Sequence, residues 1–169
     1  MHTAPQRVEL RAFVPERDLS LVGTWLRLPH VARWWGHPDY SEKAVREHRE
    51  EDSALIYLEG VPVGYLCWQI PTRRELELVG LADLPDDLVD IDIFIGPLAA
   101  TGRGIGSEAL NQLCYQLGQK GVALVGIAAS PGNLAACRAY EKIGFRSCRP
   151  FHDGGQEWNY LTKALNAAA

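Results

Sequence analysis

The chain has 169 residues, of which 47% are hydrophobic and 22% charged, and its formal net charge is -4 at pH 7. This length suits one domain over residues 1–169, and the composition is that of a globular protein, not of a disordered or fibrous one. The acidic balance argues against a nucleic-acid-binding protein, which needs clustered Lys and Arg to neutralise phosphates, and leaves open a cationic small-molecule substrate.

The four cysteines show no CxxC pairing, and residues 1–7 lack an apolar signal segment. Both features predict a reduced, cytoplasmic protein. No apolar run is as long as a membrane span, so we expect no membrane partner. His30 and His37 lie beside Asp39, but further histidines or nearby cysteines are missing, and we predict no metal site.

The first part of the chain predicts a strand and two helices. Residues 8–13 alternate between apolar and polar side chains, as a half-buried strand does. Apolar residues recur near helical spacing over residues 16–28, and Pro29 ends this helix. A further helix is predicted to begin at Ser41, as its cap, and to continue through a charged, solvent-exposed stretch to Asp52.

Two adjacent tryptophans, Trp34 and Trp35, lie in a predicted turn at residues 31–36. Adjacent side chains on a helix or strand cannot share one face, so at least one of the two should point away from the core. Partial packing and stacking on a substrate are both open for this side chain.

The middle of the chain predicts a hairpin and an irregular segment. Residues 53–58 and 61–70 are β-rich and are separated by a turn at Glu59-Gly60. Residues 71–88 contain prolines, leucines and several acidic side chains without a persistent period, so we expect a loop or a short irregular helix there.

The last half alternates strands and helices. The predicted elements are a strand at 89–95, a helix at 107–120, an apolar buried strand at 122–128, a helix at 134–143 and two strands at 145–151 and 158–162 around a turn at 153–155. The whole pattern predicts a mixed α/β domain with about seven strands and about four helices.

Three glycines, Gly102, Gly104 and Gly106, stand just before the predicted helix at 107–120. A helix N-terminus presents unpaired N–H groups and the positive end of the helix dipole, so a glycine-rich approach to it favours phosphate binding over a mere tight turn. The dinucleotide fingerprint GxGxxG does not match, because Ser107 stands where the third glycine is needed, and the P-loop pattern is absent.

Two segments, 95–110 and 133–145, resemble the motifs of the GCN5-related N-acetyltransferase (GNAT) family, and the order of predicted elements extends the likeness to the whole domain. The resemblance implies a central sheet splayed between its fourth and fifth strands and acetyl-CoA as co-substrate. Thr101 stands where the family has Arg or Gln, so binding of the pyrophosphate should depend on backbone amides.

The resemblance also implies which residues contact the coenzyme: the fourth strand near its end, the glycine loop, and the start of the helix after Asn133. These residues are Phe94, Ile95, Gly102, Arg103, Gly104, Ile105, Gly106, Ser107, Asn133 and Ala136. Asn133 has the alternative role of capping the helix that follows it, and both roles can hold.

Acetyl transfer to an amine needs a base for the amine and an acid for the departing thiolate. The resemblance assigns the acid to Tyr140, for which a core tyrosine is the alternative. Asp90 and Asp92 lie on the same face of a strand, and two carboxylates so placed repel each other, so one of their pKa values should be raised. We choose Asp92 as the base.

The N-terminal half narrows the resemblance to the aminoglycoside 6′-N-acetyltransferases, through residues 29–36, the segment 63–65 and the position of Asp92 ten residues before Gly102. It implies a polycationic aminoglycoside as acceptor, and thus an antibiotic-resistance enzyme. The expected substrate contacts are Trp34, Trp35, Tyr65, Glu77, Asp90 and Asp153. The group has an aspartate where this chain has Ala128, which puts substrate affinity or range in question.

Three other functions stay open. A related group that acetylates a hydroxylamine during siderophore synthesis shares the Trp-Trp-Gly segment, although few basic residues are at hand for a carboxylate-rich acceptor. A peptide or protein N-terminal acetyltransferase and a non-catalytic acyl-CoA-binding module are the others. No nucleic-acid partner is expected, and the protein should be a monomer or a homodimer.

Overall fold

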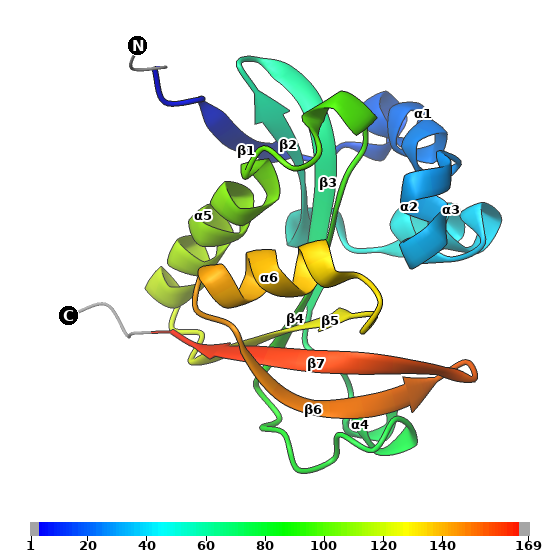
Figure 1. Cartoon of the computed structure of the whole chain (residues 1–169), viewed down its shortest axis with the longest axis vertical. Helices are drawn as coiled ribbons and strands as arrows, with labels where there is room; N and C mark the ends of the chain where they lie inside the picture. Colours follow the sequence, from blue (N-terminus) through cyan, green and yellow to red (C-terminus); the bar gives the residue numbers. More distant parts are fainter. Residues whose placement is uncertain (1–3, 166–169) are drawn as a thin grey trace. The chain divides into compact units, whose positions relative to one another are not determined.

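The computed structural model describes residues 4–165, which contain six α-helices, two 3-10 helices and seven strands (Figure 1). The strands are β1 (Val8–Ala12), β2 (Ser53–Leu58), β3 (Val61–Gln69), β4 (Val89–Ile95), β5 (Leu124–Ala129), β6 (Arg146–Asp153) and β7 (Gln156–Ala164). The helices are α1 (Pro15–Leu26), α2 (Pro29–Trp35), α3 (Pro38–Glu47), η1 (Glu50–Asp52), α4 (Arg73–Leu78), η2 (Leu98–Ala100), α5 (Ile105–Gln119) and α6 (Leu134–Lys142).

The seven strands form one sheet in the order β1-β2-β3-β4-β5-β7-β6, in which β4 and β5 are parallel. This confirms the predicted mixed α/β class and the number of strands. The chain has two more α-helices than the four expected, because residues 29–35 and 73–78 each form a short helix.

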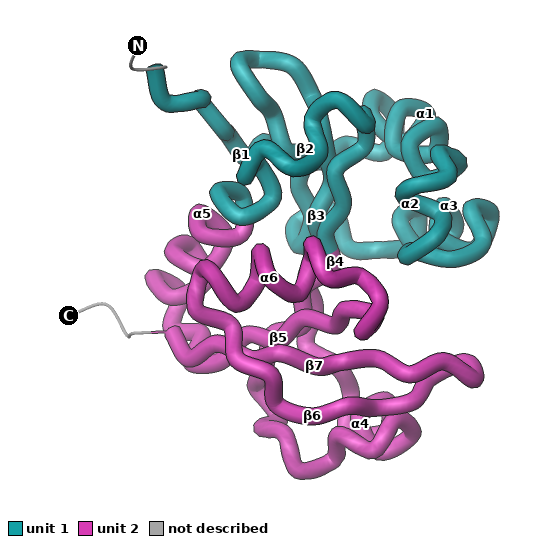
Figure 2. The backbone as a smooth tube through the Cα atoms, viewed as in Figure 1, with its two compact units in different colours: residues 1–67, 93–109 teal, residues 68–92, 110–169 magenta. Residues whose placement is uncertain are grey.

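Two compact units make up the chain: unit 1 comprises residues 1–67 and 93–109, and unit 2 comprises residues 68–92 and 110–169 (Figure 2). The boundary runs through β4 and through α5, so each unit is assembled from two separate stretches of sequence. The single domain expected over the whole chain stays a prediction.

In unit 1, β1, β2 and β3 form an antiparallel meander in which Val8 pairs with Leu58 and Ser53 with Cys67. The β2–β3 hairpin turns at Glu59 and Gly60, which both have positive φ angles, of 49° and 80°. A two-residue turn with positive φ at both positions matches the right-handed twist of the strands, so the predicted hairpin is confirmed.

The expected turn at residues 31–36 is wrong, because α2 begins at Pro29 and runs to Trp35. Pro29 ends α1 by forcing Leu28 into an extended conformation, with φ of -69° and ψ of 134°, and then occupies the first turn of the next helix, where its missing N–H costs nothing. The same residue thus stops one helix and starts another.

Ser41 does not begin a helix, as the sequence suggested, but lies inside α3. The cap is His37, whose ring accepts a hydrogen bond from the Asp39 N–H, and Pro38 follows at the first helical position. Ser41 is buried, and its hydroxyl donates to the Trp35 carbonyl oxygen at 3.0 Å, which ties α3 to the end of α2.

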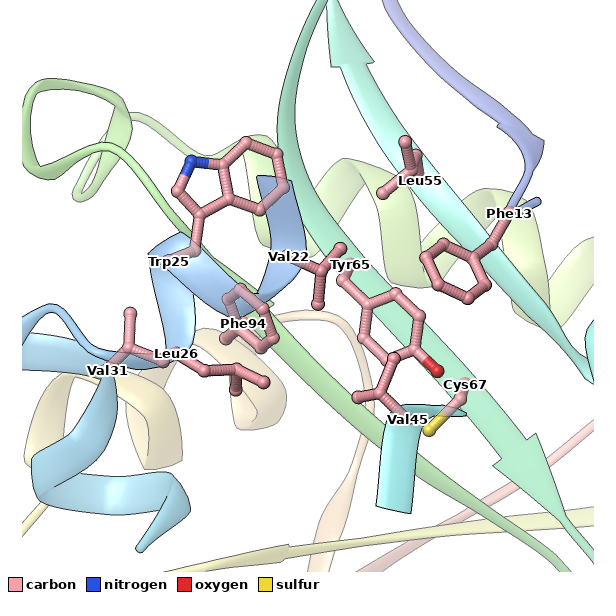
Figure 3. Close-up of a cluster of buried hydrophobic side chains, with 10 residues drawn as sticks. All are labelled: Phe13, Val22, Trp25, Leu26, Val31, Val45, Leu55, Tyr65, Cys67 and Phe94. Atoms are coloured by element: carbon pink, nitrogen blue, oxygen red, sulfur yellow. The ribbon is translucent and has the colours of Figure 1, made fainter. Parts of the chain in front are cut away.

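The core of unit 1 is an aromatic and aliphatic cluster between the strands and the three N-terminal helices (Figure 3). Phe13 packs edge-on against Tyr65 with ring centroids 5.2 Å apart, and Trp25 packs edge-on against Phe94 at 6.2 Å. A Cβ at Gly96 would collide with the Trp25 indole, so the chain needs a glycine where it leaves β4.

Unit 2 contains the antiparallel pairs β5–β7 and β6–β7, whose hairpin turns at Gly154 and Gly155. The predicted irregular segment 71–88 is confirmed as a short helix followed by turns. Helix α4 begins with a capping box, in which the Thr72 and Glu75 side chains each accept from the other residue's backbone N–H. Four leucines of this segment form a second buried cluster with Tyr160: Leu76, Leu81, Leu84 and Leu88.

Helix α5 begins at Ile105, two residues earlier than predicted, so that Gly106 and Ser107 are already helical. The predicted apolar face is confirmed, since all five of its side chains are buried: Ala109, Leu110, Leu113, Cys114 and Leu117. The early start matters for function because it moves the first helical N–H groups into the glycine loop.

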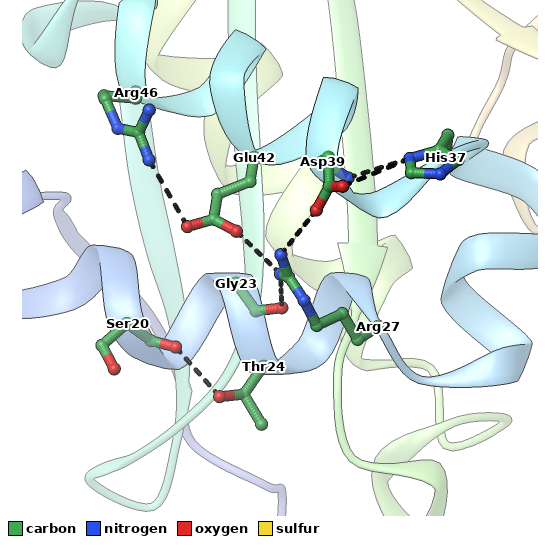
Figure 4. Close-up of polar contacts among 8 residues, drawn as sticks. All are labelled: Ser20, Gly23, Thr24, Arg27, His37, Asp39, Glu42 and Arg46. Atoms are coloured by element: carbon green, nitrogen blue, oxygen red, sulfur yellow. Dashed lines mark hydrogen bonds and ion pairs between the residues drawn. The ribbon is translucent and has the colours of Figure 1, made fainter.

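Arg27 links α1 to α3 (Figure 4). Its guanidinium donates to the Gly23 carbonyl oxygen at 2.9 Å and forms ion pairs with Asp39 at 2.9 Å and Glu42 at 2.7 Å. Arg46 also pairs with Glu42, at 3.5 Å, but within α3. Of these two arginines, Arg27 is the one whose ion pairs join the two helices.

Replacement of Arg27 by Met should lower the free energy of unfolding by about 1 kcal/mol, at the upper end for exposed ion pairs because three acceptors are lost together. Arg46→Met, the matched control, should cost only about 0.3 kcal/mol. Urea unfolding of both variants measures the difference. Equal losses would contradict a role for Arg27 between the helices.

Candidate active site

The glycine loop has the geometry of an anion cradle. Gly102 and Gly104 have φ angles of 70° and 78°, which side-chain-bearing residues rarely adopt. The first helical hydrogen bond of α5 runs from the Glu108 N–H to the Gly104 carbonyl oxygen at 3.1 Å. Since the first N–H groups of a helix have no partner within it, those of the loop and the first turn are available to an anion.

Thr101, the departure at the Arg or Gln position, uses its hydroxyl locally, donating to the Leu98 carbonyl oxygen at 2.6 Å. Arg103 is exposed, and with Gly104, Ile105 and Glu108 it lines a surface hollow of unit 1 that the N-terminal segment also borders. The residues present thus fit a phosphate group, through backbone N–H groups and the Arg103 guanidinium.

The end of β4 is held close to β3 within unit 1. The Gly96 N–H donates to the Val63 carbonyl oxygen at 2.8 Å, and a Cβ at Gly64 would lie 2.6 Å from the Phe94 carbonyl oxygen. The Phe94 side chain is buried in the core of unit 1. A coenzyme contact at Phe94, as expected from the sequence, would therefore have to use its backbone.

The two tryptophans of α2 have separate surroundings. Trp35 is partly buried, donates from its indole N–H to the Ile93 carbonyl oxygen at 3.2 Å and packs edge-on against Phe94 at 4.9 Å. Trp34 is also half-buried, and the Arg33 guanidinium lies 4.5 Å from the centroid of its ring. Trp35 is thus anchored to β4, whereas Trp34 stacks on a neighbouring cation.

Tyr65 does not have the surroundings expected of a substrate contact. Its side chain is 0% exposed and is packed among Phe13, Trp35 and Phe94. The structure corrects this expectation: alternation along β3 turns Tyr65 inward, and the residue belongs to the core of unit 1.

Asp90, in unit 2, accepts a hydrogen bond at 2.8 Å from the hydroxyl of Tyr160 on β7. This bond crosses β5 above Gly126, which pairs with Asp90 on one side and with Thr162 on the other. A Cβ at Gly126 would collide with the Tyr160 hydroxyl and ring, so only glycine lets the phenol reach the carboxyl group.

Burial raises the pKa of Asp90 well above its usual range, and the nearby Asp92 carboxylate raises it further. The sequence predicted one raised pKa from repulsion between the two carboxyl groups, and the raised pKa falls on Asp90, mainly through burial, and not on Asp92, the residue chosen as base. Burial and the Asp90 carboxylate likewise raise the pKa of Tyr160, so its hydroxyl stays protonated and remains the donor in this bond.

Asp92 is exposed and lies on the same face of β4, directly after Ile91, which pairs with Ile127 of β5. Its charge acts on Tyr140 of α6 as well: burial raises the pKa of the Tyr140 phenol, and the Asp92 carboxylate raises it further. Unit 2 therefore brings together the two residues that the sequence predicted as base and acid. The raised pKa keeps Tyr140 protonated at neutral pH, as an acid requires.

Asn133 caps α6, with its side-chain oxygen accepting from the Ala136 N–H at 3.3 Å. The capping role considered in the sequence is confirmed, while the coenzyme contacts of Asn133 and Ala136 stay predictions. Glu77 on α4 and Asp153 at the end of β6 are both exposed, and no further observation bears on their predicted contact with a substrate.

Tyr160 and Gly126 were missed by the sequence reasoning. The available signal was Gly126 itself, a glycine inside an apolar strand, which often marks a close approach of another group. The partner that approaches could not be inferred, since it depends on the pairing of β5 with β7, more than thirty residues later.

Among the described residues, no group of three or more His, Cys, Asp or Glu side chains is placed to hold a metal ion. Over residues 4–165, none of the helices combines the length and apolar character that crossing a membrane requires.

A family model described as an acetyltransferase (GNAT) domain matches residues 14–152. The chain belongs to the GNAT acetyltransferase family. The protein is thus an acyltransferase, and its co-substrate is acetyl-CoA. The matched range contains the glycine loop, Asp92 and Tyr140, so the family assignment includes every element of the site described above.

This GNAT protein is similar to curated enzymes named aminoglycoside N(6′)-acetyltransferase type 1, from Klebsiella pneumoniae and Serratia marcescens. Each is 26% identical over 147 residues, covering 77% of this chain and 70% of the relative.

Among solved structures, aminoglycoside acetyltransferase AAC(6′)-Ib with coenzyme A and kanamycin matches with a TM-score of 0.76 at 22% identity, covering 94% of this chain and 95% of that one. RimL, a ribosomal L7/L12 alpha-N-protein acetyltransferase with coenzyme A, matches with a TM-score of 0.73 at 16% identity, covering 95% and 96%. At identities this low, the structural matches show that this GNAT protein shares its fold with both, and they show nothing beyond the fold.

Gly106→Ala should separate folding from coenzyme binding in this GNAT protein. The position is helical and no atom lies nearer than 3.9 Å to the added Cβ, so the substitution should stabilise the fold by up to about 1 kcal/mol through helix propensity. If the backbone of the loop approaches the pyrophosphate, the added methyl group should still weaken coenzyme A binding roughly tenfold, or by about 1.4 kcal/mol.

Urea unfolding of the free protein and calorimetric titration with coenzyme A measure the two effects. Unchanged affinity for coenzyme A in the stably folded variant would remove Gly106 from the binding loop.

Proposed function

We propose that this protein transfers the acetyl group of acetyl-CoA directly to the 6′-amine of aminoglycosides, and so acts as an antibiotic-resistance enzyme, with Asp92 as base and Tyr140 as acid. The observation that carries the proposal is the pairing of these two residues in unit 2. An exposed carboxylate on β4 lies close enough to a half-buried phenol on α6 to raise its pKa. One group can accept a proton while the other can release one.

The choice of a polycationic acceptor has two supports. The curated relatives are named as aminoglycoside N(6′)-acetyltransferases, and the solved structure with kanamycin has the same fold. Unit 2 also presents exposed acidic side chains, Glu77, Asp92 and Asp153, in a chain with a net charge of -4. Such a distribution attracts a multiply protonated amine and disfavours an anionic acceptor.

In the proposed reaction, Asp92 and Tyr140 carry out the two proton transfers that accompany the movement of the acetyl group. Asp92, directly or through a water molecule, takes a proton from the acceptor nitrogen as this nitrogen forms a bond to the thioester carbonyl carbon. The carbon–sulfur bond breaks, and Tyr140 gives its phenolic proton to the sulfur. The proton on Asp92 then leaves to solvent, and the phenol is reprotonated for the next turnover.

The chain's own residues would hold the coenzyme in two ways. Acetyl-CoA supplies the activated acyl group when bound. The backbone N–H groups from Gly102 to Ser107 would hold its pyrophosphate with the Arg103 guanidinium, and the backbone at Phe94 and Ile95 would orient the arm that carries the thioester. Thr101 makes no contact in this proposal, because its hydroxyl is bonded to Leu98.

The proposal predicts thiol release from acetyl-CoA with kanamycin-type and gentamicin-type acceptors that have a free 6′-amine. Asp92→Asn and Tyr140→Phe should each lower kcat/KM by about 10²-fold or more, the usual contribution of a positioned acid or base. Tyr115→Phe is the matched control, because this exposed hydroxyl accepts a hydrogen bond from the Gln119 side chain.

Polyamines, hydroxylamine acceptors and N-terminal peptides serve as comparison substrates. Turnover of one of these without turnover of any aminoglycoside would reassign the acceptor. Full activity of both Asp92→Asn and Tyr140→Phe would contradict the proposed roles, and coenzyme binding without any thiol release would leave a non-catalytic acyl-CoA-binding module.

A further inference from the structure

His30 of α2 makes a hydrogen bond to the residue that follows β4, and the reaction above does not use it. The His30 Nε2 lies 2.7 Å from the Gly96 carbonyl oxygen. A carbonyl oxygen can only accept, so Nε2 carries the proton, and the neutral ring has the Nε2–H tautomer. Because Gly96 is buried, His30 satisfies a carbonyl group to which water has little access.

Both backbone polar groups of Gly96 are held by other parts of unit 1. Its N–H donates to the Val63 carbonyl oxygen on β3 at 2.8 Å, and its carbonyl oxygen accepts from His30. The position requires glycine, because the Trp25 indole fills the space of a Cβ, and glycine has more backbone freedom than any other residue. The bonds from β3 and α2 therefore restrain a residue that would otherwise act as a hinge.

The segment between Gly96 and the glycine loop is stiff. The ring of Pro97 fixes its φ angle, which is -62°. In η2, the Ala100 N–H donates to the Pro97 carbonyl oxygen at 2.9 Å. The Leu98 carbonyl oxygen accepts twice from Thr101, from its N–H at 3.1 Å and from its hydroxyl at 2.6 Å. A change in the backbone angles of Gly96 would therefore move the start of the glycine loop as one piece.

We propose that His30 is a positioning residue for the coenzyme: by holding the Gly96 carbonyl group, it sets the place from which the glycine loop presents its N–H groups to the pyrophosphate. Backbone N–H groups cannot reorient separately as side chains do, so a displaced loop loses several contacts together. The inference rests on the proposed placement of the coenzyme at this loop and does not depend on the identity of the acceptor.

Helix α2 supports the end of β4 at a second point. The Trp35 indole N–H donates to the Ile93 carbonyl oxygen at 3.2 Å. Side chains of one helix thus hold carbonyl groups on either side of Phe94 and Ile95, the residues whose backbone is proposed to orient the thioester arm. The bond from His30 therefore restrains the part of the strand that leads into the glycine loop.

A bond that only satisfied a buried carbonyl group would affect the stability of the fold and nothing else. His48 provides the matched comparison, because its Nε2 lies 3.1 Å from the Asp52 carbonyl oxygen and it is half-buried, as His30 is. The His48 bond connects the end of α3 to η1 and does not involve β4. Loss of either imidazole should lower the midpoint of urea unfolding, but loss of His30 should also weaken coenzyme binding.

Calorimetric titration of the full chain with coenzyme A tests the role of His30 without any acceptor. His30→Leu, which removes the donor, should weaken coenzyme A binding about tenfold. His30→Gln, whose side-chain N–H reaches about as far as Nε2, should bring the affinity back to within about threefold of the wild type. His48→Leu should bind coenzyme A as the wild type does.

Wild-type affinity in folded His30→Leu, an equal loss in His48→Leu, or no recovery in His30→Gln would each overturn the positioning role. The ¹H–¹⁵N NMR spectrum of the imidazole rings adds a measurement that needs no change at His30 beyond the one used to assign its signals. The neutral form of His30 should be the Nε2–H tautomer, and an Nδ1–H tautomer would exclude the bond to Gly96.

Thr101→Val tests the stiff segment at an exposed position, where the fold should tolerate the change. It removes the hydroxyl that bonds to Leu98 and should weaken coenzyme A binding about threefold, the effect of one net hydrogen bond. Unchanged affinity in Thr101→Val would overturn the rigid connection through which His30 acts, even if His30→Leu did not fold.

Comparison with Gly106→Ala separates this inference from the proposed function. Weaker coenzyme A binding in Gly106→Ala but not in His30→Leu would overturn the role of His30 and keep the coenzyme at the glycine loop. Wild-type affinity in both variants would overturn the placement of the coenzyme as well. Weaker binding in His30→Leu, in an enzyme that acetylates no aminoglycoside, would remove the proposed acceptor and support the role of His30.

Discussion

The structure depends on three glycines, in or next to strands, where another group packs directly against the backbone and leaves no room for a side chain. In unit 1, Trp25 occupies the space beside Gly96, and β4 approaches Gly64 so closely that a Cβ would meet the Phe94 carbonyl oxygen. In unit 2, Tyr160 occupies the space above Gly126. Each glycine admits a large aromatic ring or a neighbouring strand, so that rings pack directly on the backbone of the sheet.

This packing fixes the chemical groups that flank it. In unit 1, Trp35 both packs on Phe94 and donates to the Ile93 carbonyl oxygen, while the Gly96 N–H bonds to Val63. The end of β4 is thereby held from two sides before the chain enters the glycine loop. A loop that binds an anion through backbone N–H groups needs such a rigid approach, because it has few side chains to correct its position.

The titratable groups of unit 2 differ in their surroundings. Burial keeps Tyr140 and Tyr160 protonated, and it makes Asp90 harder to ionise than Asp92, which is exposed to water. Burial therefore decides how readily such a group ionises. Family membership makes the protein an acetyltransferase.

The sequence by itself determined the mixed α/β class, the seven strands, the β2–β3 hairpin, the buried face of α5 and the family, because these follow from local periodicity, turn chemistry and contiguous motifs. The roles of Asp92 as base and Tyr140 as acid stay predictions. The sequence reasoning failed at α2, where Pro29 starts a helix as well as ending one, and at Tyr65, whose burial depends on packing from α2 and β4.

Only the tertiary structure decided that Tyr160 bonds to Asp90 across Gly126, since three strands distant in sequence must first align in register. It likewise decided which carboxyl group of the pair has the raised pKa, because burial is a property of the folded chain and not of residue spacing.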